Sequence, residues 1–414
     1  MRSGAPNPSP SDGASMNPTP FPDPLPSPAT AASRRRRIAI FLAGAALGGA
    51  VGIGIAELFA VDVAARFAGR LAADLWTVLM LPLVWWVCVV VHEFGHLLGG
   101  RIGGMRALML FAGPLHIEFN ADGVRVLRNR VTATWGGLAA CAPHGERSSG
   151  RARFALLVAG GPMASVLLAA ATVPAAFAVG GWWGGLLLVT AAMSAGIGVA
   201  TLIPVRAGGY MSDGGQLLGL AHRDQETRQR LALVALSGQS HAGVRPRDWD
   251  PALLRTIGEE SGDATLRAVA AMLAANRAED RGDLEAADAN WRAVAAVVGG
   301  EQGSSMAPAM RGSFAIGLAA WIGQRRREGG SARRWLDASK GGFAEAAIRA
   351  HAEAAVALAE GDTDAARRHR DAARAALPRL SDRGAALALA DALDDLAREI
   401  AAAISQDVNV VARS

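Results

Sequence analysis

Four long apolar segments occupy the first half of the chain and limit what it can fold into. Each is long enough to cross the roughly 30 Å hydrocarbon layer of a bilayer as a helix that rises 1.5 Å per residue. They cover residues 38–60, 75–100, 154–180 and 182–205. Because the later sequence is Ala-rich and charged, we predict a membrane domain followed by a soluble helical domain.

Arginines orient the predicted spans, because cytoplasmic loops carry an excess of basic residues. Arg34–Arg37 precede the first span, and eight arginines lie within residues 101–153, in the connection after the second span. The connection after the first span has only Arg66 and Arg70. We therefore expect an integral protein of a bacterial cytoplasmic membrane with both termini in the cytoplasm.

The net charge of +5 follows largely from these arginines. No nucleic-acid-binding motif accompanies the charge, so the expected partner of the first half is the lipid bilayer and not a nucleic acid. Cysteine is scarce, and Cys88 and Cys141 do not suggest a disulfide framework. Cys88 lies one helical turn before His92, where packing as a small apolar residue is favoured over a metal contact.

The second span ends in the pentapeptide His92-Glu93-Phe94-Gly95-His96. Residues four apart share one face of a helix, so the two imidazoles can offer nitrogens to one metal ion while Glu93 stands beside it. Ionisable side chains next to hydrocarbon are energetically expensive and are by default functional. At 1.5 Å per residue, His92 lies roughly 25 Å along the helix from Leu75, towards the cytoplasmic side.

A hydrolytic zinc site usually has three protein ligands, so a third ligand must come from elsewhere. Asp213 follows the fourth span and precedes two glycines, which let backbone approach closely. An Asp before an apolar run also commonly caps a helix. Given the two histidines, metal ligation is the favoured role of Asp213.

These features resemble the intramembrane site-2 protease family of zinc metallopeptidases, over roughly residues 75–222. The resemblance consists of three elements in the same order: His92-Glu93-x-x-His96, Gly161-Pro162 in the third span, and Pro204 followed by Asp213-Gly214. It implies that His92, His96 and Asp213 bind Zn²⁺ and that Glu93 is the general base. The implied enzyme is a zinc metalloendopeptidase that acts on the membrane-embedded or membrane-proximal segment of another protein.

The resemblance also implies substrate-binding residues. Gly161 and Pro162 are candidates, and so are Ser165 and Thr201, which stand where the family often has asparagines. A hydroxyl has a shorter reach than an amide and only one donor. The interval from Pro204 to the aspartate is also longer than in the commonest form of the family.

Residues 106–131 alternate apolar and polar side chains on both sides of Asp122-Gly123, a pattern that predicts a small cytoplasmic β-hairpin. Such a hairpin either pairs with an unwound substrate by strand addition or is a solvated connection, and the pattern favours neither. His116 and His144 are interpreted as surface or structural residues.

Beyond residue 223 the sequence favours helices throughout. Gly282-Asp283 and Gly361-Asp362 each separate two Ala-rich helical segments, an arrangement that looks like tetratricopeptide repeats, although a plain helical bundle fits equally well. As repeats, these helices would hold a peptide or protein partner.

The predicted fold is an all-α polytopic membrane protein with about four transmembrane helices and a small cytoplasmic β-hairpin, followed by a soluble, tetratricopeptide-like α-helical domain. It divides into four parts: a disordered Pro-rich tail (1–33), a transmembrane metalloprotease domain (34–222), a cytoplasmic α-helical repeat-like domain (223–405) and a tail (406–414).

Three functions are compatible with this organisation. The favoured one is an intramembrane zinc endopeptidase that cleaves a peptide bond in or near a transmembrane segment of a membrane-protein substrate. The alternative is a catalytically inactive membrane scaffold with a retained metal site and partner-binding helical repeats. A metal transporter is least favoured, because transport needs a path to both sides, whereas Glu93 beside two histidines suits hydrolysis.

Overall fold

The computed structural model describes residues 19–24, 75–120, 123–129, 134–143, 150–207, 210–304 and 306–411. Three helices in these ranges are long and apolar enough to cross a membrane: α3 (Leu75–Ile102), α4 (Arg151–Val179) and α5 (Gly181–Leu202). They match the second, third and fourth predicted spans. The first predicted span lies outside the described residues, and so does the predicted tail 1–33 apart from residues 19–24.

Small residues let α3 and α4 approach each other closely. A Cβ atom on Gly95 would lie 2.4 Å from the carbonyl oxygen of Gly160, and one on Gly99 would lie 2.1 Å from that of Leu156. Backbone contact of this kind is how small residues pack apolar helices in a membrane. The crossing lies on the same turns of α3 as the two motif histidines, so α4 covers them directly.

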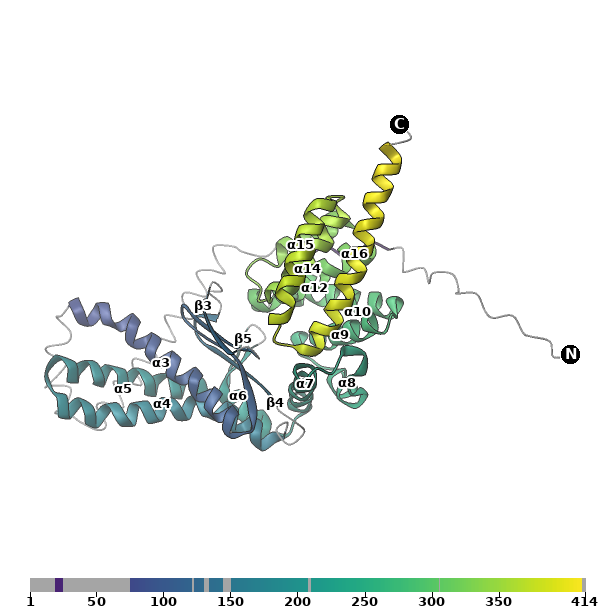
Figure 1. The fold of residues 1–414 in the computed structure, drawn as a ribbon. Helices are drawn as coiled ribbons and strands as arrows, with labels where there is room; N and C mark the ends of the chain where they lie inside the picture. Colours follow the sequence, from purple (N-terminus) through teal and green to yellow (C-terminus); the bar gives the residue numbers. More distant parts are fainter. Residues whose placement is uncertain are drawn as a thin grey trace.

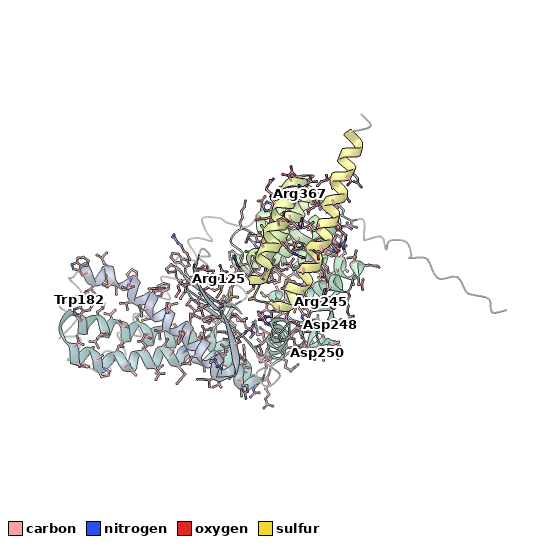
Figure 2. The ribbon with its side chains drawn as sticks, viewed as in Figure 1. Arg125, Trp182, Arg245, Asp248, Asp250 and Arg367 are labelled. Carbon is pink, nitrogen blue, oxygen red and sulfur yellow. The ribbon has the colours of Figure 1, made fainter. Side chains whose placement is uncertain are left out.

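The three long helices run side by side away from the rest of the molecule (Figure 1). Figure 2 places Trp182 at the end that is remote from the β-sheet. Its indole nitrogen donates a hydrogen bond to the Thr77 hydroxyl (3.0 Å), which ties the start of α5 to the start of α3. Trp76 and Trp183 are about two-thirds exposed at this end, as expected for aromatic residues at a membrane interface.

A four-stranded antiparallel sheet follows α3. Its strands are β1 (Met105–Ala112), β2 (Leu115–Asn120), β3 (Gly123–Arg128) and β4 (Leu138–Pro143), in the order β3-β2-β1-β4. The predicted hairpin is the β2–β3 pair, in which Asn120 lies opposite Gly123. The prediction of a single hairpin was incomplete, because the hairpin belongs to a sheet of four strands. Strand β4 reads Leu-Ala-Ala-Cys-Ala-Pro and has no apolar–polar alternation, since its residues on both faces are half-buried or buried.

The sheet lies between the long helices and the C-terminal helices (Figure 1). On one side, Leu110 and Ala112 of β1 form a buried cluster with Val89 and Leu97 of α3. On the other side, the ring of Phe111 meets that of Phe343 edge-on, with 5.6 Å between centroids. The long apolar helices and the C-terminal region are therefore packed against one common sheet.

A short excursion connects α5 to the next helix, α6 (Asp213–His222). It contains the two-stranded pair β5 (Arg206–Ala207) and β6 (Tyr210–Met211). At its end, α6 presses against α5, since a Cβ atom on Gly214 would lie only 1.7 Å from the carbonyl oxygen of Leu202. The long interval before Asp213 thus forms a compact turn that returns the chain to the helix ends.

The C-terminal region is helical, as predicted. Its α-helices are α7 (Gln225–His241), α8 (Pro251–Ile257), α9 (Ala264–Asp280), α10 (Leu284–Gly299), α11 (Glu301–Ser304), α12 (Pro308–Trp321), α13 (Gly329–Ala338), α14 (Ala346–Ala359), α15 (Thr363–Ala376) and α16 (Arg383–Val411). Three shorter turns are η3 (Pro246–Asp248), η4 (Ile322–Arg326) and η5 (Leu377–Arg379). Arg245, labelled in Figure 2, pairs with Asp280 and with Asp391, and so ties α16 to α9.

The two predicted helix-turn-helix units are α9–α10 and α14–α15, and they share one turn geometry. The amide of Asp283 donates to Ala278 O (2.9 Å), and that of Asp362 donates to Ala357 O (2.9 Å). Each aspartate then caps the following helix with its carboxylate. This confirms the helix pairs, while the repeat family and the domain boundaries stay predictions.

The helical region packs against the sheet through β4. A Cβ atom on Gly238 of α7 would lie 3.0 Å from the Pro143 side chain and 3.1 Å from its carbonyl oxygen. The end of β4 therefore touches α7 without space for a side chain between them.

Candidate metal centre

Helix α3 places both motif histidines in the protein interior. His92 is 3 % exposed and His96 is 9 % exposed, and their ring centroids lie 4.9 Å apart at nearly a right angle. The spacing of four residues along the helix brings both Nε2 atoms to the same place. Buried polar groups need partners, so the surroundings of these rings decide what the site can do.

Asp213 is the third residue of the cluster, and α6 delivers it. Its Oδ2 lies 3.3 Å from His92 Nε2, and its Oδ1 lies 3.5 Å from His96 Nε2. One ligand atom from each of the three residues lies within 4.8 Å of the others. A side chain after the fourth span therefore meets two side chains of the second span, as the sequence predicted.

Ser212, and not Asp213, caps helix α6. The Ser212 hydroxyl oxygen accepts a hydrogen bond from the amide of Gly215 (3.2 Å). The same hydroxyl donates to Ile203 O (2.6 Å) and accepts from the amide of Val205. Because Ser212 fills the capping role, the Asp213 carboxylate is left to face the histidines.

The outer nitrogens of the histidines also have partners. His92 Nδ1 lies 2.9 Å from the Ser165 hydroxyl, and His96 Nδ1 lies 2.9 Å from Leu157 O, both on α4. A carbonyl oxygen only accepts, so this hydrogen bond puts the proton of neutral His96 on Nδ1. Its Nε2 lone pair then faces the Asp213 carboxylate. A metal ion or a proton between these two electron-rich atoms would satisfy both of them.

The geometry fits zinc in two respects. Nitrogen and oxygen ligands of a tetrahedral zinc ion, each at 2.0–2.2 Å, lie about 3.4 Å apart, close to the two histidine–aspartate separations. Metal-binding histidines also characteristically donate their other ring nitrogen to a carbonyl or similar group, as His96 does. The cluster could therefore hold a metal ion with three protein ligands.

Gly161 provides the space for that ion. A Cβ atom on this residue would lie 2.3 Å from His96 Nε2 and 2.8 Å from His92 Nε2. Any side chain here would fill the volume that the two nitrogens face. Gly161 was predicted as a substrate-binding residue, and the structure places it directly at the histidine rings.

The other predicted substrate-binding residues lie at different depths. Pro162 and Ser165 are buried in α4, where the Ser165 hydroxyl is occupied by His92 and its carbonyl accepts from Ser194. Thr201 lies on the last turn of α5, and its hydroxyl donates to Gly198 O (3.2 Å). Substrate binding by all four residues stays a prediction.

Glu93 lies beside the cluster and against the start of β4. It is 7 % exposed, and a Cβ atom on Gly137 would lie 2.1 Å from its Oε1. Gly137 has a φ of +111°, a conformation that residues with side chains rarely adopt. The sequence reading missed Gly137. The pair Gly136-Gly137 before an apolar segment was the available signal for a close backbone approach.

The remaining histidines and cysteines near the sheet have structural roles. The Cys88 thiol donates to Thr190 O on α5, which confirms its packing role. Cys141 packs against Gly100, and burial raises the pKa of its thiol to about 12. His116 stacks on Phe111 with 4.0 Å between ring centroids, and burial lowers its pKa. His144 lies outside the described residues.

A comparison of the chain with protein-family models, with curated proteins and with solved structures found no match. The site combines a His-His-Asp cluster that could hold a metal ion with helices of membrane-spanning length.

Proposed function

We propose that the protein is an intramembrane zinc endopeptidase of the site-2 protease type. It would hydrolyse a peptide bond in or near a transmembrane segment of a membrane-protein substrate. One observation supports this most strongly: Asp213 of α6 meets His92 and His96 on α3, a helix long enough to cross a membrane, and Glu93 lies on the same turn of α3. Such a setting combines a hydrolytic ligand set with burial among apolar helices.

His92, His96 and Asp213 would hold the zinc ion. Zinc, when bound, supplies a Lewis acid that polarises a carbonyl and acidifies water. The Glu93 carboxylate would take the proton of the attacking water and later deliver it to the leaving amine nitrogen. Gly137 fixes where that carboxylate can lie, because no side chain separates the two residues.

Strand β4 is the best candidate for holding an extended substrate. In the part of the chain that the structure describes, β4 lies at one edge of the sheet. Its first residue follows Gly137, which contacts Glu93. A substrate strand added to this edge would run past the Glu93 carboxylate. A transmembrane helix hides its peptide bonds in internal hydrogen bonds, so the substrate must unwind before it can pair in this way.

The proposal is tested by replacing the base and the ligands separately. We expect Glu93→Gln to keep its zinc and to lose at least about 100-fold in cleavage rate, since a general base contributes 10²–10⁴-fold. His96→Ala should lose both zinc and cleavage. Zinc content is measured on protein purified in detergent. Cleavage is followed by comparing the membrane proteomes of cells that express each variant.

The matched control is Glu285→Gln, which makes the same chemical change at an exposed position of α10. It should behave as the unmodified protein in both measurements. Cleavage by Glu93→Gln at the unmodified rate would remove Glu93 as the base. Bound zinc without any cleaved membrane protein would instead favour the alternative, an inactive scaffold.

A further inference from the structure

Residues Thr19–Pro24 lie across the C-terminal helices, more than 260 positions away in the sequence. They form neither helix nor strand, and the helical region contacts their main chain through side chains. Arg292 donates to the carbonyl oxygens of Thr19 and Pro20, and Arg326 also donates to that of Thr19. The helical region therefore holds this segment as a receptor holds an extended peptide.

Two further hydrogen bonds continue this pattern along the segment. The Trp335 indole donates to Pro22 O (3.0 Å), and the amide of Phe21 donates to the Glu328 carboxylate (3.3 Å). Main-chain groups of the segment are thus satisfied from α10, from the turn after α12 and from α13.

The side chain of Phe21 anchors the segment. It is 4 % exposed and belongs to the same buried cluster as Val294, Val298 and Trp335. The Arg292 guanidinium lies over its ring, 4.4 Å from the centroid, in cation–π geometry. An aromatic side chain in a desolvated pocket beneath an arginine is the usual composition of a binding hot spot.

Contacts within the helical region itself hold the two arginines that face the segment. Asp288, 2 % exposed, accepts from Arg292 Nε (2.8 Å) and from the Trp321 indole (3.2 Å), and it lies 3.9 Å from Arg326 Nε. One buried carboxylate therefore positions both arginines that face the segment. Ordering them before binding lowers the entropic cost of holding a peptide.

The rest of the groove also suits a proline-flanked peptide. A Cβ atom on Gly299 would lie 3.3 Å from Asp23 O, so its absence leaves room for the main chain. Arg334 pairs with the Asp23 carboxylate (2.7 Å). Prolines at 20, 22 and 24 restrict the free segment to extended conformations, which reduces the entropy lost on binding.

We propose that the C-terminal helical region is a receptor for short extended peptides with an aromatic residue between prolines, and that residues 19–24 are its resident ligand. The segment acts as a tether. Residues 25–37, at ~3.5 Å each, span at most about 45 Å, so the bound segment keeps the helical region near the predicted first span. A partner protein with a similar segment would have to displace it. This inference does not depend on peptidase activity.

The test uses the full chain in detergent and a fluorescent peptide of residues 17–26, with binding followed by fluorescence anisotropy. The Phe21→Ala chain, whose own segment has lost its anchor, should bind the peptide. The unmodified chain should bind it at least about 10-fold more weakly, because its own segment competes at a high effective concentration. A peptide with alanine in place of its phenylalanine should bind at least about 30-fold more weakly than the parent peptide.

Groove residues are tested in the Phe21→Ala background. Adding Arg292→Ala should abolish peptide binding. Adding Arg333→Ala is the matched control, because Arg333 pairs with Glu360 and not with the segment, and binding should persist. Failure of a folded Phe21→Ala chain to bind the peptide would overturn the proposal, and so would equal binding of the alanine peptide.

A second measurement leaves every contact residue unchanged. A protease site is inserted between residues 28 and 33, and the purified chain is cut and mixed with excess labelled peptide. Exchange of the cut fragment for the labelled peptide, with an unchanged circular dichroism spectrum, supports a receptor and ligand. A fragment that never exchanges, or a helical region that unfolds once the fragment leaves, makes the segment a fixed part of the fold and overturns the proposal.

Discussion

At the scale of single residues, the candidate metal centre depends on the hydrogen-bond partner of the outer ring nitrogen of each histidine. His96 donates to a backbone carbonyl, which no substitution of a side chain removes. His92 Nδ1 instead hydrogen-bonds to the hydroxyl of Ser165, a fully buried side chain. A point mutation can therefore remove the hydrogen-bond partner of His92 but not that of His96.

Ser165→Ala should lower the affinity for zinc by about 10–100-fold, the usual effect of removing the partner of a metal-binding histidine. Competition with a chelator measures it. Thr190→Val is the control, because the Thr190 hydroxyl donates to Leu186 O of its own helix. An unchanged zinc affinity in Ser165→Ala would mean that the contact with His92 does not orient the ring.

The sequence could predict the parts of this site that are local. His92, Glu93 and His96 lie within five residues, and helical periodicity alone brings them together. Asp213 was favoured as the third ligand because two histidines leave the site incomplete, and the family resemblance agreed. Its contact with α3 could not be derived from the sequence, because the turn that returns it to α3 is a tertiary feature. Ser165 could be placed on α4 but not assigned to His92, since the rotation of α4 is set by the contacts of Gly95 and Gly160.

At the scale of secondary-structure elements, β4 is a strand that sequence reasoning missed, and the glycine before it contacts Glu93. Period-2 alternation of apolar and polar residues predicts strands, and β3 shows it in Val124-Arg125-Val126, although nearly all of its residues are exposed. Strand β4 is half-buried or buried on both faces, so its sequence resembles a short apolar connection. The most informative strand for function thus had the weakest sequence signal.

Gly137→Ala tests the contact at the start of β4. A methyl group there would collide with the Glu93 carboxylate and would need a backbone conformation that alanine avoids. We expect zinc content to be retained and cleavage to fall by at least about 100-fold, the usual result of misplacing a reacting group by 1 Å. The same two assays as for Glu93→Gln apply.

Gly136→Ala is the matched control for this prediction, because a Cβ atom on Gly136 would meet nothing within 4 Å. Full cleavage by Gly137→Ala would show that Glu93 can move aside without loss of function.

At the scale of the whole molecule, the C-terminal region contains a buried histidine that makes its stability depend on pH. His351 of α14 is 9 % exposed and hydrogen-bonds to the Gln324 side chain (2.8 Å). Burial, with a smaller contribution from Arg325, lowers its pKa to about 4. Between pH 6.5 and pH 4 the unfolded chain thus binds a proton that the folded chain excludes, so acidification destabilises the fold.

We expect the free energy of unfolding to fall by about 2 kcal/mol from this histidine between pH 7 and pH 5. Burial raises the pKa of Glu279, Glu345 and Glu399, which acts in the opposite direction. The measurement is therefore a difference: denaturant unfolding at both pH values for the unmodified chain and for His351→Gln, which should lose this dependence. His369→Gln on α15, a histidine whose side chain is 42 % exposed, serves as the control. Equal pH dependence in His351→Gln and in the unmodified chain would contradict the assignment.

Strand β4 connects two separate contacts, because its two ends lie against different parts of the molecule. The loop at its start abuts the Glu93 carboxylate, and Pro143 at its end abuts Gly238 of α7. Six residues at about 3.3 Å each give the strand a length of roughly 20 Å. We expect a displacement of α7 along the strand axis to move Gly137 against the Glu93 carboxylate, which would link the helical region to the candidate metal centre.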